Sequence, residues 1–392
     1  VNLLMKDPKG KEESVRYYWS RRYQSYLTVK KFALAAEAIR SNAPNKNVQS
    51  YVALSGHALY FPSKMPLDMF QLAQYSGLMP GISDWMTSGS WNWDSHQAVA
   101  FSVAPFNAGA RRYGTDFGDP PLSFPMMHCV YPTLFRAYTQ LGNQCKFISY
   151  YNYGPDYEVT EGYWSHTGLG WGVQHVNNQA ALMDDILGPA VMRPSRVALL
   201  YSMAQEIWWP QGTFADKRAT FLALSHCYYQ PELVTDEQVL EGALGHYDAL
   251  FVLEQFVPRA VQERIGDWVK GGGLLWTCAD AFTRDEYNEQ FDILQKLADI
   301  KRDFTKVLSE PVQFKPVEGE TLLREHEIPP LGRSKESIRP CICEWRDAKV
   351  RATYSDGHPA MGEKRIGKGK IVYLGHRAGL VYSRRAGARG PF

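Results

Sequence analysis

The chain has 392 residues, of which 45% are hydrophobic and 21% are charged, and this composition excludes a disordered, collagen-like or coiled-coil protein. Its length is about two and a half times the roughly 150 residues typical of one domain, so we expect two domains. The 43 lysines and arginines balance 41 aspartates and glutamates, which leaves a formal net charge of +2. We therefore expect neither nucleic acid nor an anionic membrane as a partner.

The apolar runs and the cysteines exclude further classes. The longest apolar run, residues 98–110, is shorter than the roughly 18 residues of a membrane-spanning helix and contains Ser102, Pro105 and Asn107. The six cysteines are scattered and form no C-x-x-C pair, which argues against a disulfide framework and a metal site. We expect no metal and no cofactor.

Aromatic residues are abundant and unevenly placed. The 11 Trp, 23 Tyr and 18 Phe make up 13% of the chain and crowd into residues 17–171. Aromatic side chains on a surface stack on flat ligands such as sugar rings. A large apolar core is the alternative interpretation of the same composition.

The two ends of the chain suggest a fragment. The sequence starts at Val1, shows no signal-peptide pattern and enters a helical pattern within about fifteen residues. At the other end, residues 383–392 combine Arg384, Arg385 and Arg389 with glycine and alanine, so we expect a tail there. The compartment in which the protein works stays open.

Helix and strand patterns alternate along the first 192 residues. Apolar residues three or four positions apart predict a helix over residues 15–39, which stops before Pro44. The next elements are listed in chain order: strand 48–54, helix 67–76, strand 79–83, helix 96–113 with an interruption near Pro105, strand 123–130, helix 132–141 and strand 146–151. Strands that are separated by helices pair in parallel, so we expect a parallel sheet.

A parallel sheet binds its ligands beyond the carboxyl ends of its strands, whether it is a closed barrel or an open sheet. The segments at that edge are residues 55–62, residues 84–95, Tyr131 and residues 152–171. They are rich in Trp, His, Tyr and Asp. The sequence therefore predicts a site in this half of the chain.

A second alternation starts after a helical segment at 178–192 and the boundary Arg193-Pro194-Ser195. The predicted elements are strand 196–201, helix 216–228, strand 231–235, helix 237–244, strand 248–254, helix 258–270, strand 274–278 and helix 291–298. The sequence is then polar and rich in proline up to Pro340, before β structure at 350–354 and 370–374. This pattern is typical of a doubly wound, flavodoxin-like sheet.

Three stretches carry a resemblance to a known family. The first is Phe147-Ile148-Ser149-Tyr150-Tyr151-Asn152-Tyr153, followed by Glu161 and His166; the second is Arg196-Val197-Ala198-Leu199-Leu200-Tyr201 with Trp208 and Trp209. The third consists of residues 247–252, the run Trp268-Val269-Lys270-Gly271-Gly272-Gly273 and residues 367–375. In order and spacing they resemble glycoside hydrolase family 42, the β-galactosidases that carry a trimerisation domain behind a TIM barrel.

The resemblance implies an α/β protein with two domains and a tail. Residues 1–192 would be strands five to eight of a (β/α)8 barrel, and residues 193–382 an amidotransferase-like, doubly wound domain used for assembly, so that the protein would be a homo-oligomer and, by resemblance, a trimer. Residues 383–392 would be the tail. A carbohydrate is the substrate that the resemblance implies.

The two catalytic carboxylates that the resemblance implies have no clear match in this sequence. Glycosidases of this class use two carboxylates about 5 Å apart. By resemblance, the acid/base follows strand four and lies before Val1, and the nucleophile ends strand seven. Residues 124–131, which occupy that place, contain no carboxylate. Glu158, in the loop after the last barrel strand with Asp156 beside it, is the catalytic candidate; a solvated loop carboxylate is the alternative.

Other side chains at the same edge offer stacking faces and hydroxyl-binding groups, as a sugar subsite requires. The substrate-binding candidates are His57, Asp84, Trp85, Trp91, Trp93, Tyr153, Glu161, Trp164 and His166. Packing of the barrel rim is the alternative for the tryptophans, and a structural hydrogen-bonding role is the alternative for each histidine. A zinc site built from His57, His128 and His166 would need a supporting second shell that nothing in the sequence indicates.

Three hypotheses of function follow. The first is a glycoside hydrolase, β-galactosidase-like, that cleaves O-glycosidic bonds in its full-length form. The second is a non-catalytic carbohydrate-binding or scaffold protein that has lost the barrel nucleophile. The third is an amidohydrolase that uses Cys278, although Thr277 and Ala279 replace the glycines that a nucleophile turn needs, and a buried inert cysteine is the alternative.

Overall fold

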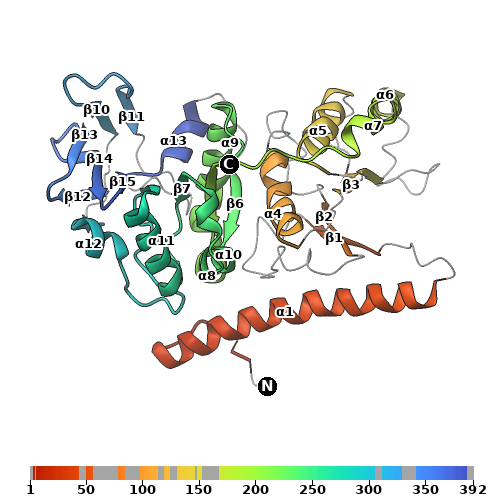
Figure 1. Ribbon diagram of the computed structural model, residues 1–392, viewed down its shortest axis with the longest axis horizontal. Helices are drawn as coiled ribbons and strands as arrows, with labels where there is room; N and C mark the ends of the chain where they lie inside the picture. Colours follow the sequence, from red (N-terminus) through yellow and green to blue (C-terminus); the bar gives the residue numbers. More distant parts are fainter. Residues whose placement is uncertain are drawn as a thin grey trace. The chain divides into compact units, whose positions relative to one another are not determined.

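The computed structural model describes residues 3–4, 6–43, 50–55, 78–83, 98–113, 119–123, 130–145, 148–151, 167–304, 311–328 and 341–385. The chain forms two compact units (Figure 1). Val1–Arg21 together with Ser195–Ala388 makes up the C-terminal unit, and Arg22–Pro194 together with Arg389–Phe392 makes up the N-terminal unit. Among the described helices, none combines the length and the apolar character that crossing a membrane requires.

Helix α1, Lys11–Asn42, is longer than the predicted helix at 15–39 and contributes residues to both units. Glu12 and Glu13 lie in its first turn and Arg40 in its last, so the charges at both ends interact favourably with the helix dipole. Within the C-terminal unit, Tyr17 and Tyr18 of this helix pack against Ala204, Ile207 and Phe256.

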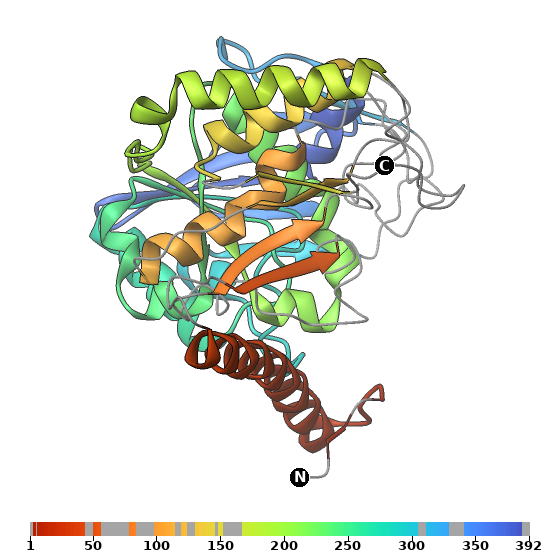
Figure 2. The same cartoon turned by 90° about the vertical axis from the view of Figure 1, so that its right-hand side faces the viewer.

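Two pairs of parallel strands organise the N-terminal unit. β1 (Ser50–Ser55) pairs with β2 (Leu78–Ser83), and Figure 2 shows both arrows running in the same direction. β3 (Asp119–Ser123) pairs with β4 (Ile148–Tyr151), also in parallel, and β2 lies beside β3. The prediction of parallel pairing is confirmed for these two pairs.

Besides the part of α1 from Arg22 onward, the described residues of this unit form the helices α4 (Ala98–Tyr113), α5 (Val130–Gly142), α6 (Thr167–Leu182) and α7 (Asp184–Leu187). Ala137 of α5 and Val176 of α6 are buried against each other, with Leu134 and Ile148 packed around them. The predicted helix at 67–76 lies outside the described residues.

Two predictions in this unit were wrong in part, and a third lies mostly outside the described residues. β3 ends at Ser123 and α5 begins at Val130, so residues 124–129 of the strand that was predicted at 123–130 are not described. Pro120 and Pro121 suggest a turn, yet they are tolerated in β3 because its pairing is irregular between Asp119 and Leu122. Helix α4 continues through Pro105, and the helical segment predicted at 178–192 is α6 and α7 instead.

The C-terminal unit is built on a nine-stranded mixed sheet in the order β11-β10-β13-β14-β15-β8-β7-β5-β6. Its parallel part consists of β5 (Val197–Tyr201), β6 (Glu232–Thr235), β7 (Ala249–Val252), β8 (Leu274–Cys278) and β15 (Gly369–Leu374). Numbered along the chain, these five strands have the order 2-1-3-4-5, which is that of flavodoxin-like sheets. The five predicted strands are confirmed.

The antiparallel part of the sheet confirms the predicted β structure at 350–354 and adds strands that the sequence analysis did not predict. It consists of β10 (Val312–Pro316), β11 (His326–Ile328), β13 (Lys349–Tyr354) and β14 (Pro359–Ile366). A separate antiparallel pair is formed by β9 (Ile300–Asp303) and β12 (Ile342–Trp345). β9, β10 and β11 lie in the polar, proline-rich stretch, for which the sequence analysis predicted no element.

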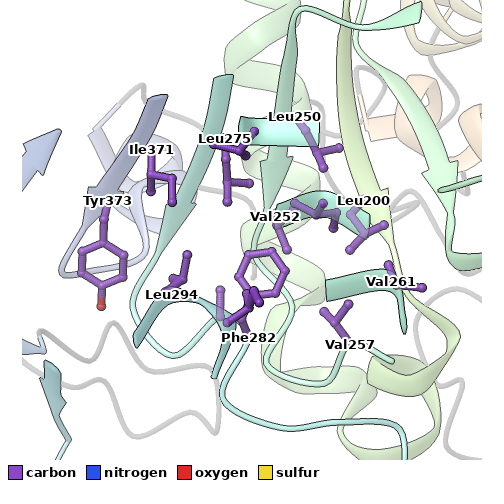
Figure 3. Packing of buried hydrophobic residues seen from close by; sticks show 14 of the residues in the cluster. Leu200, Leu250, Val252, Val257, Val261, Leu275, Phe282, Leu294, Ile371 and Tyr373 are labelled. Atoms are coloured by element: carbon purple, nitrogen blue, oxygen red, sulfur yellow. The ribbon is translucent and has the colours of Figure 1, made fainter. Parts of the chain in front are cut away.

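The helices of this unit are α8 (Met203–Trp208), α9 (Pro210–His226), α10 (Asp236–Leu240), α11 (Arg259–Gly271), α12 (Ile293–Ala298) and α13 (Ala378–Arg385), with a 3₁₀ turn at Ala243–His246. α11 presents Val261, Ile265 and Val269 at helical spacing to the sheet, and all three are fully buried. Figure 3 shows the core that results, in which Val252, Leu275 and Phe282 belong to one buried cluster. Each such side chain contributes about 1.5–3 kcal/mol by burial.

Candidate functional site

In the N-terminal unit, the register of the strands brings their carboxyl ends together. Ser55 at the end of β1 lies opposite Ser83 at the end of β2. Ser123 at the end of β3 lies opposite Tyr151 at the end of β4. Within each pair, the two following segments therefore leave the strands at the same edge, where parallel sheets hold their ligands.

All ten predicted site residues belong to the segments that follow β1, β2 and β4, and they lie outside the described residues. They are His57, Asp84, Trp85, Trp91, Trp93, Tyr153, Glu158, Glu161, Trp164 and His166. His128, which follows β3, is also outside. Their roles stay predictions.

The observed end of β3 shows which segment would have to supply a nucleophile after this strand. β3 ends at Ser123, and residues 120–155 contain no aspartate or glutamate. The segment that leaves the sheet after this strand therefore supplies no carboxylate. The first carboxylates in the sequence after β3 are Asp156, Glu158 and Glu161, which follow the adjacent strand β4.

The C-terminal unit collects a buried charged cluster at the carboxyl edge of its parallel strands. Six residues form it: Glu206, Asp216, Lys217, Glu254, Asp280 and Arg377. Glu206, Glu254, Asp280 and Arg377 lie just after β5, β7, β8 and β15, while Asp216 and Lys217 come from α9. Only Asp280 reaches solvent appreciably, with 17% of its side chain exposed.

Lys217 lies at the centre of this cluster. Its Nζ donates a hydrogen bond to Glu206 Oε1 at 2.7 Å, is 3.4 Å from Glu254 Oε1 and lies 4.1 Å from the centre of the Tyr201 ring. Burial alone would lower the pKa of Lys217, but the two carboxylates outweigh it and raise the pKa above its ordinary value. Burial raises the pKa of Glu206 and of Glu254.

The position of Lys217 in the fold is specific. β6 and β7 flank β5 on opposite sides, so the strand order reverses between β5 and β7. Doubly wound sheets bind their ligands in the crevice at this reversal. Glu206 follows β5 and Glu254 follows β7, so the ammonium group of Lys217 fills the place of a ligand.

The buried Gln205 ties the two connections together. Its Oε1 accepts hydrogen bonds from the backbone N–H groups of Gln255 at 2.9 Å and Phe256 at 3.1 Å, and its Nε2 donates to the carbonyl of Trp209 at 2.6 Å. The segments after β5 and β7 are thereby held in a fixed arrangement around Lys217.

Arg377 compensates a second pair of acids. Its guanidinium forms an ion pair with Asp280 and lies 3.6 Å from Asp216 Oδ2. Asp216 Oδ1 accepts a hydrogen bond from the backbone N–H of Leu380 at 3.0 Å, so a residue of α9 caps the first turn of α13. A Cβ on Gly379 would lie 2.4 Å from the carbonyl oxygen of Asp216, which explains why glycine stands at this contact.

Cys278 does not have the surroundings of a nucleophile. The thiol is fully buried, with Asp216 Oδ2 at 4.0 Å. Burial first, and then the negative charge of Asp216, raise the pKa of Cys278 well above its ordinary value. Reactive cysteines need the opposite, a stabilised thiolate that solvent reaches. Over the part of the chain that the structure describes, no three His, Cys, Asp or Glu side chains are grouped so as to hold a metal ion.

The chain was compared with known proteins. No protein-family model and no curated protein matches it. Among solved structures, β-galactosidase from Bacillus circulans sp. alkalophilus is similar with a TM-score of 0.72 and 14% identity over 97% of this chain and 60% of that one. β-Galactosidase from the haloarchaeon Halorubrum lacusprofundi gives a TM-score of 0.71 and 17% identity over 98% and 61% of the two chains.

A catalytic mutant of Gan42B, a GH42 β-galactosidase from G. stearothermophilus, gives a TM-score of 0.69 and 14% identity over 96% of this chain and 57% of that one. The chain thus spans about three fifths of the length of these relatives. At such low identity the likeness concerns the fold. Over nearly its whole length, this chain has the fold of the GH42 β-galactosidases, which confirms the resemblance in the sequence.

Proposed function

We propose that this chain is part of a glycoside hydrolase that cleaves O-glycosidic bonds of β-galactoside-like substrates in its full-length form. The observation that carries the proposal is the likeness to β-galactosidases over nearly the whole chain. The N-terminal unit would then be the second half of a (β/α)8 barrel. The segments after β1 to β4 would line the sugar site, with their tryptophans as stacking faces.

We propose Glu158 as the nucleophile from the order of carboxylates along the barrel edge. Because residues 120–155 carry no carboxylate, the segment after β3 leaves that role empty. Glu158 follows β4, whose carboxyl end lies beside that of β3. A carboxylate supplied from the adjacent strand reaches the same edge of the sheet, so Glu158 is the proposed catalytic group, with Glu161 as a sugar-binding neighbour.

The C-terminal unit is proposed to serve assembly rather than catalysis. At the carboxyl edge of its parallel strands Lys217 is buried in an ion pair with Glu206, and Cys278 is buried with a raised pKa. By resemblance to the trimerisation domain of the family, the full-length protein would form a homotrimer. Light scattering of the full-length protein measures this directly, and a monomer at micromolar concentration would contradict it.

The test of the enzymatic proposal is an assay of the full-length protein on a panel of aryl glycosides that includes aryl β-galactosides. We expect turnover on at least one β-glycoside, with retention of anomeric configuration if Glu158 acts as nucleophile. A folded sample that releases no aglycone from any member of the panel would exclude the hydrolase.

A second candidate function is favoured by one observation. A barrel that has lost the carboxylate after β3 and gained none elsewhere keeps only its capacity to bind, so the full-length protein would be a carbohydrate-binding scaffold. Calorimetric titration with galactose, mannose and their β-linked disaccharides separates the two functions. Saturable binding without hydrolysis would select the scaffold.

A further inference from the structure

Helix α1 is buried along one face and exposes apolar side chains along another. Tyr18, Ser25, Val29 and Ala36 follow one another at helical spacing and are buried. The second face, which we name the outer stripe, consists of exposed residues that also recur at helical spacing: Trp19, Tyr23, Tyr26, Leu27 and Leu34. Between 39% and 56% of each of these residues is exposed. A helix face that meets water is normally polar, so an apolar stripe of this length marks a surface for another protein.

Charged residues continue the outer stripe at its two ends. Arg16 lies three residues before Trp19, and Glu37 lies three residues after Leu34. Both charged side chains are exposed, and their spacing places them on the face of the stripe. At a rise of 1.5 Å per residue, the distance from Arg16 to Glu37 along the helix axis is about 30 Å. The face thus has a basic end, an apolar middle and an acidic end.

This order makes the face complementary to itself when a second copy of the helix runs in the opposite direction. With a two-fold axis between residues 26 and 27, each residue faces the one that lies equally far on the other side of the axis. The facing pairs are Arg16 with the partner's Glu37, Trp19 with the partner's Leu34, Tyr23 with the partner's Lys30, and Tyr26 with the partner's Leu27. A parallel copy would instead place Arg16 against Arg16 and Glu37 against Glu37, and like charges repel.

Lys30, the charged residue in the middle of the face, also fits this register. Its Nζ lies 5.7 Å from the centre of the Tyr26 ring of its own helix, and the rings of Tyr23 and Tyr26 stack with their centres 6.3 Å apart. The ammonium group therefore already lies beside an aromatic ring. In the antiparallel pair it also faces the partner's Tyr23, and contact with a second ring compensates the water that it loses.

We propose that α1 is an interface through which two copies of the protein pair, with their α1 helices antiparallel in this register. The interface is separate from the trimer proposed for the C-terminal unit and does not depend on it. Together with that trimer it gives a hexamer, and without it a dimer. The loss of the α1 interface halves the mass of the assembly in either case, so the two proposals fail in distinguishable ways.

The test is the molar mass of the full-length protein, measured by sedimentation equilibrium over a range of concentrations. Leu27→Glu places two carboxylates beside the two-fold axis, and we expect it to halve the mass of the original assembly. Ile39→Glu is the matched control, because Ile39 is an exposed apolar residue of the same helix outside the stripe. This control should leave the mass unchanged. A Leu27→Glu variant that keeps its mass, or an Ile39→Glu variant whose mass is halved, would overturn the proposal.

Charge reversal tests the register with substitutions at exposed positions. Glu37→Arg faces the partner's Arg16 and should raise the dissociation constant of the pair about tenfold, because the change occurs twice in a symmetric pair. Arg16→Glu combined with Glu37→Arg reverses both partners and should restore the original constant. If the double variant associates as weakly as the single one, the antiparallel register is wrong. If Leu27→Glu lowers the melting temperature and leaves the mass unchanged, the stripe is covered within one chain and the proposal is equally overturned.

Discussion

The two units of this chain use the same edge of a parallel sheet in different ways. In the N-terminal unit, the sequence after the strands contains the tryptophans, histidines and acids of the proposed sugar site. In the C-terminal unit, the corresponding edge is occupied by ion pairs of the chain itself, with Lys217 and Arg377 among four acids. The difference teaches that topology locates a site, whereas burial and charge pairing decide whether a ligand from outside has access to it.

The comparison predicts that substitutions at the two edges act on different properties. The largest effect is expected on activity in the N-terminal unit. Glu158→Gln in the full-length protein should lower kcat on an aryl β-glycoside by about 10²- to 10⁴-fold with little change in melting temperature, because the amide can neither attack nor transfer a proton. Asp156→Asn is the matched control and should keep most of the activity. Equal losses in the two variants would remove Glu158 from the mechanism.

The next effect is expected on stability in the C-terminal unit. Arg377→Met leaves Asp216 and Asp280 without their cation, and breaking a buried pair in this way costs about 3–5 kcal/mol of unfolding free energy. Arg346 has 75% of its side chain exposed and pairs with Asp299 at 3.7 Å, so Arg346→Met should cost about 0–1 kcal/mol. Denaturant titration of the chain measures both. Similar losses for the two variants would mean that the cluster is not structurally important.

A pH dependence follows from His376, just after β15 at the same edge. Burial, and then the nearby His326, lower the pKa of His376 to about 3, and its Nδ1 lies 3.3 Å from the Tyr354 hydroxyl. The unfolded chain binds the proton first, near pH 6.5, so folding stability is lost as the pH falls. Between pH 7 and pH 5 this group should remove about 2 kcal/mol. The difference between the original chain and His376→Gln, measured by denaturant titration at both pH values, isolates this contribution; parallel losses would contradict it.

The smallest effect concerns the capping box at the end of β6. Thr235 Oγ1 accepts from the backbone N–H of Gln238 at 3.3 Å, and the Gln238 side chain accepts from the backbone N–H of Thr235 at 2.9 Å. Thr235→Ala should lower the unfolding free energy by about 1 kcal/mol, whereas Thr235→Ser should retain most of it. A serine variant as unstable as the alanine variant would show that the methyl group, and not the cap, matters here.

The sequence predicts the parallel framework well, for a physical reason. β5, β7 and β8 are short apolar runs between helices, and such runs are buried on both faces in a parallel sheet. The start of α6 was not predicted because its local sequence is unusual for a helix. Gly168, Gly170 and Gly172 lower the helix propensity at the start of α6, and its packing on α5 compensates for them.

The buried cluster is not predictable from the sequence by the same reasoning. Lysine, glutamate and aspartate are usually solvent-exposed, so Lys217 and Glu254 suggest surface positions when they are read singly. Their pairing joins segments from three different elements, and only the fold brings these together. One signal is present in the sequence, since Glu254 follows the end of β7 by two residues, where a parallel sheet presents its polar groups.

β15 is the last of the described strands in chain order, yet it lies inside the sheet between β8 and β14. Residues 279–368 separate it from β8, so on the ribosome the two parts of the sheet stay unjoined until Leu374 has left the exit tunnel. Until then the nascent chain exposes two unpaired strand edges, the form in which strands associate with the wrong partner. A chain that ends before residue 369 would therefore lack the strand that joins the parallel and antiparallel parts of the sheet.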